Sequence, residues 1–148
     1  MEQQVALRRP SPEDVDIFYQ NQADISACQM ARFPARSESD FKAHWQRITQ
    51  DPDNVIFSIE VNGEVVGNMM SWLDGEKRLI GYWLGTQYWG KGYATKALKQ
   101  FLQHFERPLH AYVHQDNLIS QRVLEKCGFM PCAQMETEDG IDLMFCLA

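Results

Sequence analysis

The sequence predicts a mixed α/β (α+β) domain in which helices flank a mostly antiparallel central sheet. A chain of 148 residues fits one domain, and no repeat, low-complexity tract or linker divides it, so residues 1–148 are expected to fold as one unit. In the first half, β-rich segments are separated by tight turns, which is typical of antiparallel strands. In the second half, β-rich segments alternate with apolar stripes of helical period.

The chain is expected to begin with a strand and two helices. Residues 5–8 (Val-Ala-Leu-Arg) are predicted as the first strand. Ser-Pro-Glu-Asp at 11–14 offers a capping hydroxyl, a proline in the first turn and early carboxylates, which predict a short helix to about Gln20. Ser-Glu-Ser-Asp at 37–40 predicts a second helix start. The helix that follows has one apolar face, formed by Phe41, Trp45 and Ile48.

A three-stranded antiparallel meander is predicted next. Residues 55–61 are β-rich, Asn-Gly at 62–63 is a strong two-residue hairpin signal, and residues 64–73 form the returning strand. Asp-Gly-Glu at 74–76 is a further turn, and residues 78–84 form the third strand. The antiparallel part of the sheet is therefore expected in the first half of the chain.

The second half predicts two helices between strands. One apolar stripe comprises Ala94, Ala97, Leu98, Phe101, Leu102 and Phe105, and Pro108 is expected to close that helix. Residues 109–113 form a strand, and Asn117 is a good N-cap for a second helix. Gly128 is placed for a left-handed C-terminal cap, and residues 141–147 form the last strand.

Composition and charge exclude several classes of protein. The formal net charge of −6 argues against non-specific nucleic-acid binding, which needs a basic surface. No apolar run approaches the ~20 residues of a membrane-spanning helix, and residues 1–9 lack the apolar stretch of a secretory signal. We therefore expect a cytoplasmic protein with no nucleic-acid and no membrane partner.

The four cysteines, Cys28, Cys127, Cys132 and Cys146, match neither zinc-ligand spacing nor a dense disulfide framework. We expect them to be reduced, mostly buried small apolar residues, and we expect no metal site.

Residues 84–95 contain the most informative local pattern, because a strand runs through a glycine-bearing loop directly into a helix. Gly90 and Gly92 allow positive φ and close approach to a ligand, and the first amides of the helix would form an anion site. Lys91 and Lys96 would add positive charge. The alternative is a plain tight turn. Neither the Walker pattern nor the dinucleotide fingerprint is present.

The same segment resembles the acetyl-CoA loop of the GNAT acetyltransferase superfamily, Gln/Arg-x-x-Gly-x-Gly/Ala, and reads Trp-Gly-Lys-Gly-Tyr-Ala at 89–94. A second match is the Asn-x-x-Ser…Leu-Glu-Lys-x-Gly-Phe signature, at 117–120 and 124–129. Together with Gly-Tyr-Trp-Leu-Gly at 81–85, this is similar to the ribosomal-protein-alanine acetyltransferase branch, which acetylates ribosomal-protein N-termini. The resemblance covers nearly the whole chain and implies a GNAT fold.

The resemblance implies that acetyl-CoA is the cosubstrate and that an amine attacks its thioester directly in a ternary complex. The backbone around Leu84 would pair with the pantetheine like an added strand, and the amides of residues 89–95 would hold the pyrophosphate. The residues expected to bind the cofactor are Trp83, Leu84, Trp89, Gly90, Lys91, Gly92, Tyr93, Ala94, Thr95 and Asn117.

Ser120 is the predicted catalytic residue, facing the CoA sulfur as a proton or hydrogen-bond donor; the alternative is an ordinary first-turn serine. Asn117 would contact the pantetheine region, act as a helix cap, or do both. Two positions depart from the wider family. Trp89 replaces the polar residue that opens the loop motif, and Leu124 stands where many GNAT enzymes have a proton-donating tyrosine.

The general base is left open. His114 has a suitable intrinsic pKa, but an uninvolved loop histidine is the alternative, and a water chain can replace a dedicated base. The other candidates are carboxylates, which more often only solvate a surface: Glu60, Asp74, Glu76 and Asp116.

The acceptor is expected to be a primary amine, on a protein N-terminus or a small molecule, and the chain to be a monomer or homodimer. Trp72, Tyr82 and Trp83 are candidates to line the acceptor cleft, although core packing is the alternative, and Phe33 and Trp45 would flank it. Two other functions compete with acetyl transfer. One is a non-catalytic acyl-CoA-binding module, and the other is a phosphate-binding regulatory domain.

Overall fold

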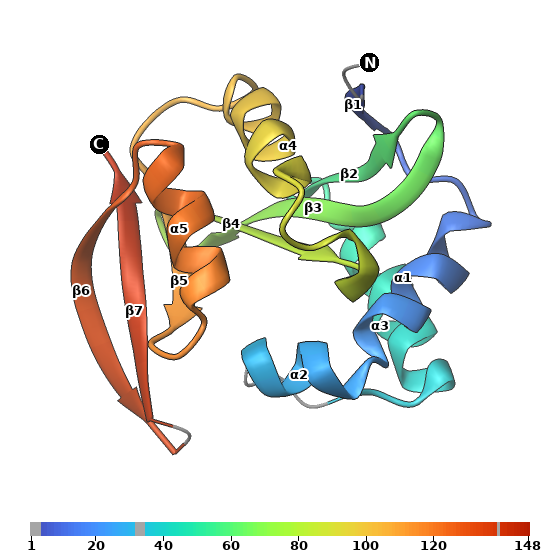
Figure 1. The fold of residues 1–148 in the computed structure, drawn as a ribbon, viewed down its shortest axis with the longest axis horizontal. Coiled ribbons are helices and arrows are strands. Elements are labelled where there is room, and N and C mark those ends of the chain that lie inside the picture. The colour runs from blue at the N-terminus through green and yellow to red at the C-terminus, as the bar shows by residue number, and fades with distance from the viewer. Residues whose placement is uncertain (1–3, 32–34, 139) are drawn as a thin grey trace.

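A computed structural model describes residues 4–31, 35–138 and 140–148. Its seven strands form one sheet in the order β1-β2-β3-β4-β5-β7-β6. All neighbouring strands are antiparallel except β4 and β5, which are parallel. The predicted fold class, a mixed and mostly antiparallel sheet flanked by helices, is confirmed (Figure 1).

The elements follow one another along the chain with short connections. They are β1 Val5–Arg8, α1 Asp14–Gln22, α2 Ile25–Ala31, α3 Glu38–Gln50, β2 Val55–Val61, β3 Glu64–Asp74, β4 Lys77–Leu84, a 3₁₀ turn Thr86–Tyr88, α4 Tyr93–Leu102, β5 Leu109–His114, α5 Leu118–Lys126, β6 Met130–Thr137 and β7 Gly140–Leu147. The predicted meander corresponds to β2, β3 and β4.

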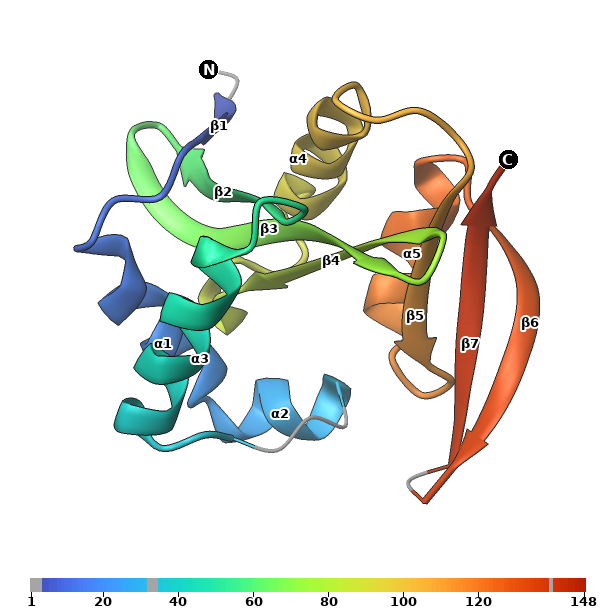
Figure 2. The same ribbon diagram turned by 180° about the vertical axis from the view of Figure 1, so that it is seen from behind.

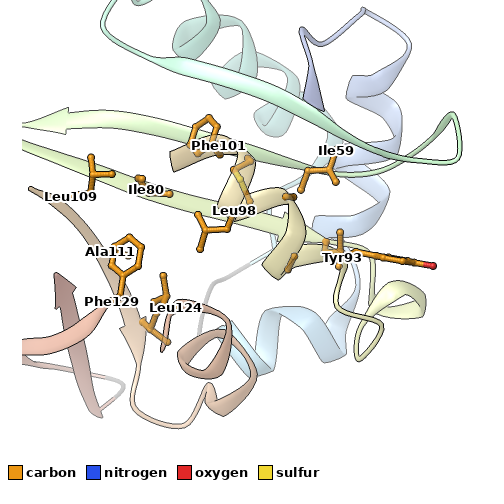
Figure 3. Packing of buried hydrophobic residues seen from close by; sticks show 14 of the residues in the cluster. Ile59, Ile80, Tyr93, Leu98, Phe101, Leu109, Ala111, Leu124 and Phe129 are labelled. Carbon is orange, nitrogen blue, oxygen red and sulfur yellow. The ribbon is translucent and has the colours of Figure 1, made fainter. Parts of the chain in front are cut away.

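Helices cover both faces of the sheet. Figures 1 and 2, taken from opposite sides, show α4 and α5 on one face and α1 and α3 on the other. The apolar stripe of α4 explains its position, because Ala97, Leu98 and Phe101 are fully buried. Figure 3 shows Leu98 and Phe101 on the same side of the sheet as Leu124 of α5. Alternation along β4 directs Ile80 and Leu84 into this core.

The sheet opens between β4 and β5. The two strands are in register at a single pair, Leu79 with His110, near the start of each strand. Beyond that pair they diverge, as the directions of β4 and β5 in Figure 1 show. Within the described residues, the edge of β4 that faces β5 therefore carries no continuous hydrogen-bonded ladder towards Leu84, and its backbone is open to a ligand.

Two local predictions need correction, and two elements were not predicted. Helix α2 and strand β6 were not predicted, and α4 ends at Leu102 rather than near Pro108. Strand β6 lies at the sheet edge with all its residues exposed, so it lacks the alternation that marks a half-buried strand. Ser11 is not a side-chain cap; instead its backbone N–H donates to the Asp14 carboxylate at 2.9 Å. Ser37, in contrast, does cap α3.

The prediction that all four cysteines are reduced is wrong for two of them. Cys132 and Cys146 form a disulfide between the neighbouring strands β6 and β7. Because Cys132 lies at an irregularity in an edge strand that the sequence did not predict, its proximity to Cys146 could not be anticipated. Cys28 and Cys127 are free and half-buried, in agreement with the prediction of reduced thiols.

A buried carboxylate joins the N-terminal segment to the sheet. Asp14, 4 % exposed, accepts hydrogen bonds from the Arg8 guanidinium at 2.7 Å and the Ser58 hydroxyl at 2.7 Å. Arg8 also pairs with Glu60 on β2. Burial raises the pKa of Asp14, but the hydrogen bonds from Arg8, Ser11 and Ser58 outweigh it and lower that pKa to about 2. This cluster thus depends on a charged Asp14.

The described part of the chain shows neither a membrane-spanning helix nor a cluster of metal ligands. None of its helices combines the length and the apolar character that crossing a membrane requires. In the same residues, no three histidine, cysteine or acidic side chains come together as metal ligands would.

Candidate functional site

The turn that precedes α4 presents backbone amides. Gly90 and Gly92 have φ of +74° and +82°, a region that glycine enters without strain. Gly92 is the N-cap and supplies no capping side chain, and the Lys96 N–H makes the first-turn bond to the Gly92 carbonyl at 3.1 Å. The amides that precede Lys96 are those that a helix N-terminus offers to an anion.

Trp89 fixes this turn against the end of β4, because its indole N–H donates to the Leu84 carbonyl at 3.0 Å. Trp89 occupies a position of the loop motif that is polar in the wider family. The hydrogen bond to Leu84 gives the indole a role at this position. It ties the loop to the strand, so the α4 amides and the open edge of β4 face the same space.

That space is a cavity of about 290 Å³ between the end of β4, the start of α4 and the first turns of α5. It is lined by Ala27, Met30, Tyr82, Trp83, Leu84, Tyr88, Trp89, Gly90, Gly92, Tyr93, Ala94, Thr95, Asn117, Ile119, Ser120, Arg122, Val123 and Lys126. Every residue predicted to bind the cofactor is in this lining except Lys91, whose side chain is exposed; Ser120 is also in it.

The positive charges at the cavity come from residues that sequence reasoning missed. Arg122 and Lys126 of α5 line it, whereas Lys91 and Lys96 do not. Residues four apart lie on one face of a helix. The spacing of Arg122 and Lys126 could therefore have predicted that both basic side chains lie on the same side of α5.

A pair of hydroxyls lies at the wall formed by β4 and α5. The Tyr82 hydroxyl and Ser120 Oγ are 3.0 Å apart, and either can donate. Burial raises the pKa of Tyr82 to about 12, so the phenol keeps its proton at neutral pH. Asn117 caps α5 by accepting the Ser120 N–H at 3.3 Å, which orients the first turn of the helix. From the sequence, Tyr82 was predicted only to line the acceptor cleft or to pack in the core.

Leu124 is 3 % exposed and packs in the core, so it supplies no proton donor. His114 is 4 % exposed, its Nδ1 accepts the Asp116 N–H at 3.1 Å, and it lines neither cavity of the site. The structure thus places His114 as a support for the loop before α5. No aspartate or glutamate lines either cavity among the described residues.

A second cavity, of about 220 Å³, lies on the other face of the sheet, beneath α1 and α3. Its lining residues are Phe18, Gln22, Arg36, Phe41, His44, Trp45, Ile48, Asn68, Met70, Trp72, Gly81, Tyr82 and Trp83. Tyr82 and Trp83 line both cavities, so the two meet at β4. The predicted acceptor residues Trp45, Trp72, Tyr82 and Trp83 are thus brought together, whereas Phe33 lies outside the described residues.

The arrangement of the site defines a class: a domain in which a helix start preceded by glycines at positive φ lies beside a sheet that opens between β4 and β5. The same fold occurs in an aminoglycoside acetyltransferase AAC(6')-Ib in complex with coenzyme A (TM-score 0.84, 19 % identity, 98 % of this chain and 95 % of that chain). It also occurs in RimL, a ribosomal L7/L12 alpha-N-protein acetyltransferase in complex with coenzyme A (TM-score 0.82, 18 % identity, 97 % and 93 %). A third match is a GNAT-family acetyltransferase from Bacillus anthracis (0.80, 17 %, 97 % and 93 %).

The family is established by the sequence itself. A model of the acetyltransferase (GNAT) domain matches residues 4–130, which is most of the chain. The chain therefore belongs to the GNAT acetyltransferase family, and the predicted membership of this superfamily is confirmed.

Proposed function

We propose that this protein binds acetyl-CoA in the cavity between β4 and α5 and transfers the acetyl group to a primary amine. The observation that carries the proposal is the uncapped start of α4 facing the open edge of β4 within one cavity. A helix N-terminus with Arg122 and Lys126 nearby fits a diphosphate, and an unpaired strand edge fits the amide-bearing pantetheine arm.

Each part of the cosubstrate has a complementary group in the chain. The amides between Gly90 and Thr95 would hold the diphosphate, and the backbone of β4 up to Leu84 would bond the pantetheine like an added strand. Asn117 would reach the pantetheine with the part of its amide that does not cap α5. The acetyl group would then lie near Tyr82 and Trp83, where the two cavities meet.

The reaction requires a neutral amine, stabilisation of the charge on the carbonyl oxygen, and stabilisation of the departing sulfur. The amine nitrogen bonds to the acetyl carbon, the carbon–sulfur bond breaks with its electron pair on sulfur, and the nitrogen loses a proton to water. A backbone N–H on the open edge of β4 is suited to the carbonyl oxygen. The hydroxyl pair is suited to the sulfur.

Ser120 and Tyr82 would act on the sulfur through a hydrogen bond rather than by full proton transfer. The Tyr82 pKa of about 12 lies above the ~8.5 of an alkyl thiol. Complete transfer of the Tyr82 proton to the thiolate is therefore unfavourable. If Tyr82 donates to Ser120 Oγ, the serine O–H is directed at the sulfur.

Removing this pair is expected to slow turnover more than it weakens binding. Ser120→Ala should lower kcat about 10- to 100-fold, because a hydrogen bond to a charged group contributes ~1.5–3 kcal/mol. Tyr82→Phe should lower kcat by about 3- to 10-fold, since Ser120 remains. The double variant should lose little beyond Ser120→Ala, because the hydroxyls act in series. Additive losses, or an unchanged kcat in Ser120→Ala, would contradict this role.

The function is tested by following release of free thiol from acetyl-CoA with a panel of amines, together with the mass of the acetylated product. Thiol release that depends on the amine is the expected result. Leu124, which leaves the usual donor position apolar, keeps one alternative open: an acyl-CoA-binding module without turnover. Thermal stabilisation by acetyl-CoA without thiol release from any amine would favour that alternative.

The branch that acetylates ribosomal-protein N-termini is the part of the family that we propose for this chain, and a cytoplasmic location accompanies that proposal. Its support is the match of residues 81–85, 89–94 and 117–129 to motifs typical of the branch. The motifs and the site also fit a small-molecule amine as acceptor. The amine panel distinguishes such an acceptor from a protein N-terminus.

A further inference from the structure

We propose that the second cavity selects the acceptor and that the acceptor is a small amine carrying a bulky apolar group and a carboxylate, such as a hydrophobic α-amino acid. This rests on the proposed acetyl transfer and narrows the acceptor to a small molecule, in place of the protein N-terminus that the branch implies. The volume of about 220 Å³ lies below the ~300–1,000 Å³ typical of drug-sized ligands and suits one residue-sized group. Because the cavity meets the first one at Tyr82 and Trp83, an amine on its occupant can reach the acetyl group.

The walls of the second cavity are apolar and aromatic. Trp45 packs against Phe18 with ring centroids 4.9 Å apart and stacks with Phe41 at 6.3 Å. Trp72 and Trp83 line the opposite side, from the sheet. The Trp83 indole N–H is bonded to the Asn21 carbonyl at 3.0 Å, so this ring is held in place. Rigid aromatic walls favour a flat or branched apolar group, which they surround at little cost in side-chain entropy.

Gln22 supplies the polar contact expected of a ligand site. Its side chain lines the cavity and is 5 % exposed, and neither its amide nitrogen nor its amide oxygen has a hydrogen-bond partner within the described residues. Leaving a buried polar group unpaired costs ~1–3 kcal/mol, so such groups are rare without a function. Both amide atoms are shielded in the free protein, so an occupant with a carboxylate or a protonated amine would satisfy the amide once the Gln22 side chain turns towards the cavity that it lines.

The charges at the cavity favour an acid over a polycation. Arg36 lines the cavity, and no aspartate or glutamate in its described lining would attract a second ammonium group. Burial lowers the pKa of His44, and the charges of Arg36 and Arg47 lower it further, so this imidazole is neutral at pH 7. Arg36 is therefore the charged side chain in the described lining, and the five donors of a guanidinium allow it to bind a carboxylate in addition to another partner.

The experiment compares amines that differ in one group each. Thiol release from acetyl-CoA is measured with L-phenylalanine, with 2-phenylethylamine (no carboxylate), with L-alanine (no ring) and with kanamycin (a polycation). L-Phenylalanine should exceed each of the others at least about 10-fold in kcat/KM, because burial of the ring and a charge-assisted pair are each worth about that factor. A preference for kanamycin, or equal use of 2-phenylethylamine, would overturn the proposal.

Variants assign the preference to the cavity. In Arg36→Gln, the discrimination between L-phenylalanine and 2-phenylethylamine should collapse to within about 3-fold, and Arg36→Lys should keep part of it. The matched control is Arg9→Gln, which removes an exposed arginine away from both cavities and should leave the discrimination unchanged. Unaltered discrimination in Arg36→Gln would remove Arg36 from the proposal and overturn the carboxylate assignment.

Gln22→Leu separates a ligand-binding amide from a structural one. Leucine is apolar and of similar size, so removing two buried unpaired atoms should raise the melting temperature by about 3 °C while KM for L-phenylalanine rises about 10-fold. A lower melting temperature would show that the amide already has a partner in the free protein and would count against the site.

Calorimetry distinguishes failure of this inference from failure of the proposed function. If L-phenylalanine binds the CoA-loaded protein in an Arg36-dependent way but no thiol is released, the assignment of the pocket stands and the proposed acetyl transfer is overturned. Acetylation of spermidine or kanamycin alone would retain the function and overturn the acceptor class. If no apolar amino acid is either bound or acetylated, the proposed acceptor class is overturned as well.

Discussion

Gly92→Glu is expected to weaken acetyl-CoA binding at least about 100-fold. Gly92 has φ of +82°, and a side chain there strains the backbone by ~1–2 kcal/mol. The added carboxylate would also lie at the helix start where the diphosphate is proposed to bind. Two like charges ~5 Å apart repel by about 3 kcal/mol at an effective dielectric constant of 20, which alone is a factor of about 100.

Gly92→Ala is the matched control, because it retains the backbone strain without the charge. A Cβ at this position has no atom within 4 Å, so the substitution meets no steric clash. We expect Gly92→Ala to lose less than about 10-fold in affinity. Isothermal titration calorimetry gives both affinities, and circular dichroism verifies folding. Folded Gly92→Glu that binds acetyl-CoA as tightly as the original chain would refute the loop assignment.

Asp14→Ala is expected to lower the free energy of unfolding by about 2–3 kcal/mol, because the Ser58 hydroxyl loses its buried acceptor and Arg8, whose side chain is 38 % exposed, keeps only Glu60. Denaturant titration measures this loss. The control is Asp16→Ala on the same helix, whose carboxylate is 64 % exposed and pairs with Lys42; it should cost under about 1 kcal/mol. Equal effects of the two substitutions would show that the buried cluster adds no stability.

The same residue predicts how stability depends on pH. The Asp14 pKa is lowered from 3.8 to about 2 on folding, so the folded state favours the charged form. Its contribution of about 2 kcal/mol is present in full above pH ~4 and is lost as the pH falls from ~4 to ~2. This segment of the pH profile should be missing in Asp14→Ala. A profile identical to that of the original chain would contradict the assignment.

Local signals predicted most of the elements correctly. Strand β1 at Val5–Arg8 and strand β2 at Val55–Val61 lie where the sequence predicts them, because turns and alternation mark their ends. Gly128, with φ of +95°, caps α5 as its position predicts. Helix α2 and strand β6 were missed for a physical reason: α2 is only seven residues long, and β6 is exposed along its whole length and is held by its pairing with β7 rather than by an apolar face.

The candidate site was predictable in part. The loop before α4 and the first turn of α5 each show local motifs, so the residues proposed to hold acetyl-CoA were named from the sequence. The pairing of Tyr82 with Ser120 was not, because these residues are 38 positions apart and meet only where β4 and α5 come together. The unpaired amide of Gln22 was equally invisible, since burial and the lack of a partner are properties of the packed chain.

By itself, the sequence determined the fold class, the family and the glycine-bearing segment that we propose to bind the diphosphate. These depend on short-range patterns, on turn residues, and on motifs that lie within a few positions of one another. Only the tertiary structure decided that β4 and β5 separate, that two cavities meet at Tyr82 and Trp83, and that Cys132 is bonded to Cys146. The physical reason is that strand pairing and side-chain burial join residues far apart in the chain, where no local pattern records the contact.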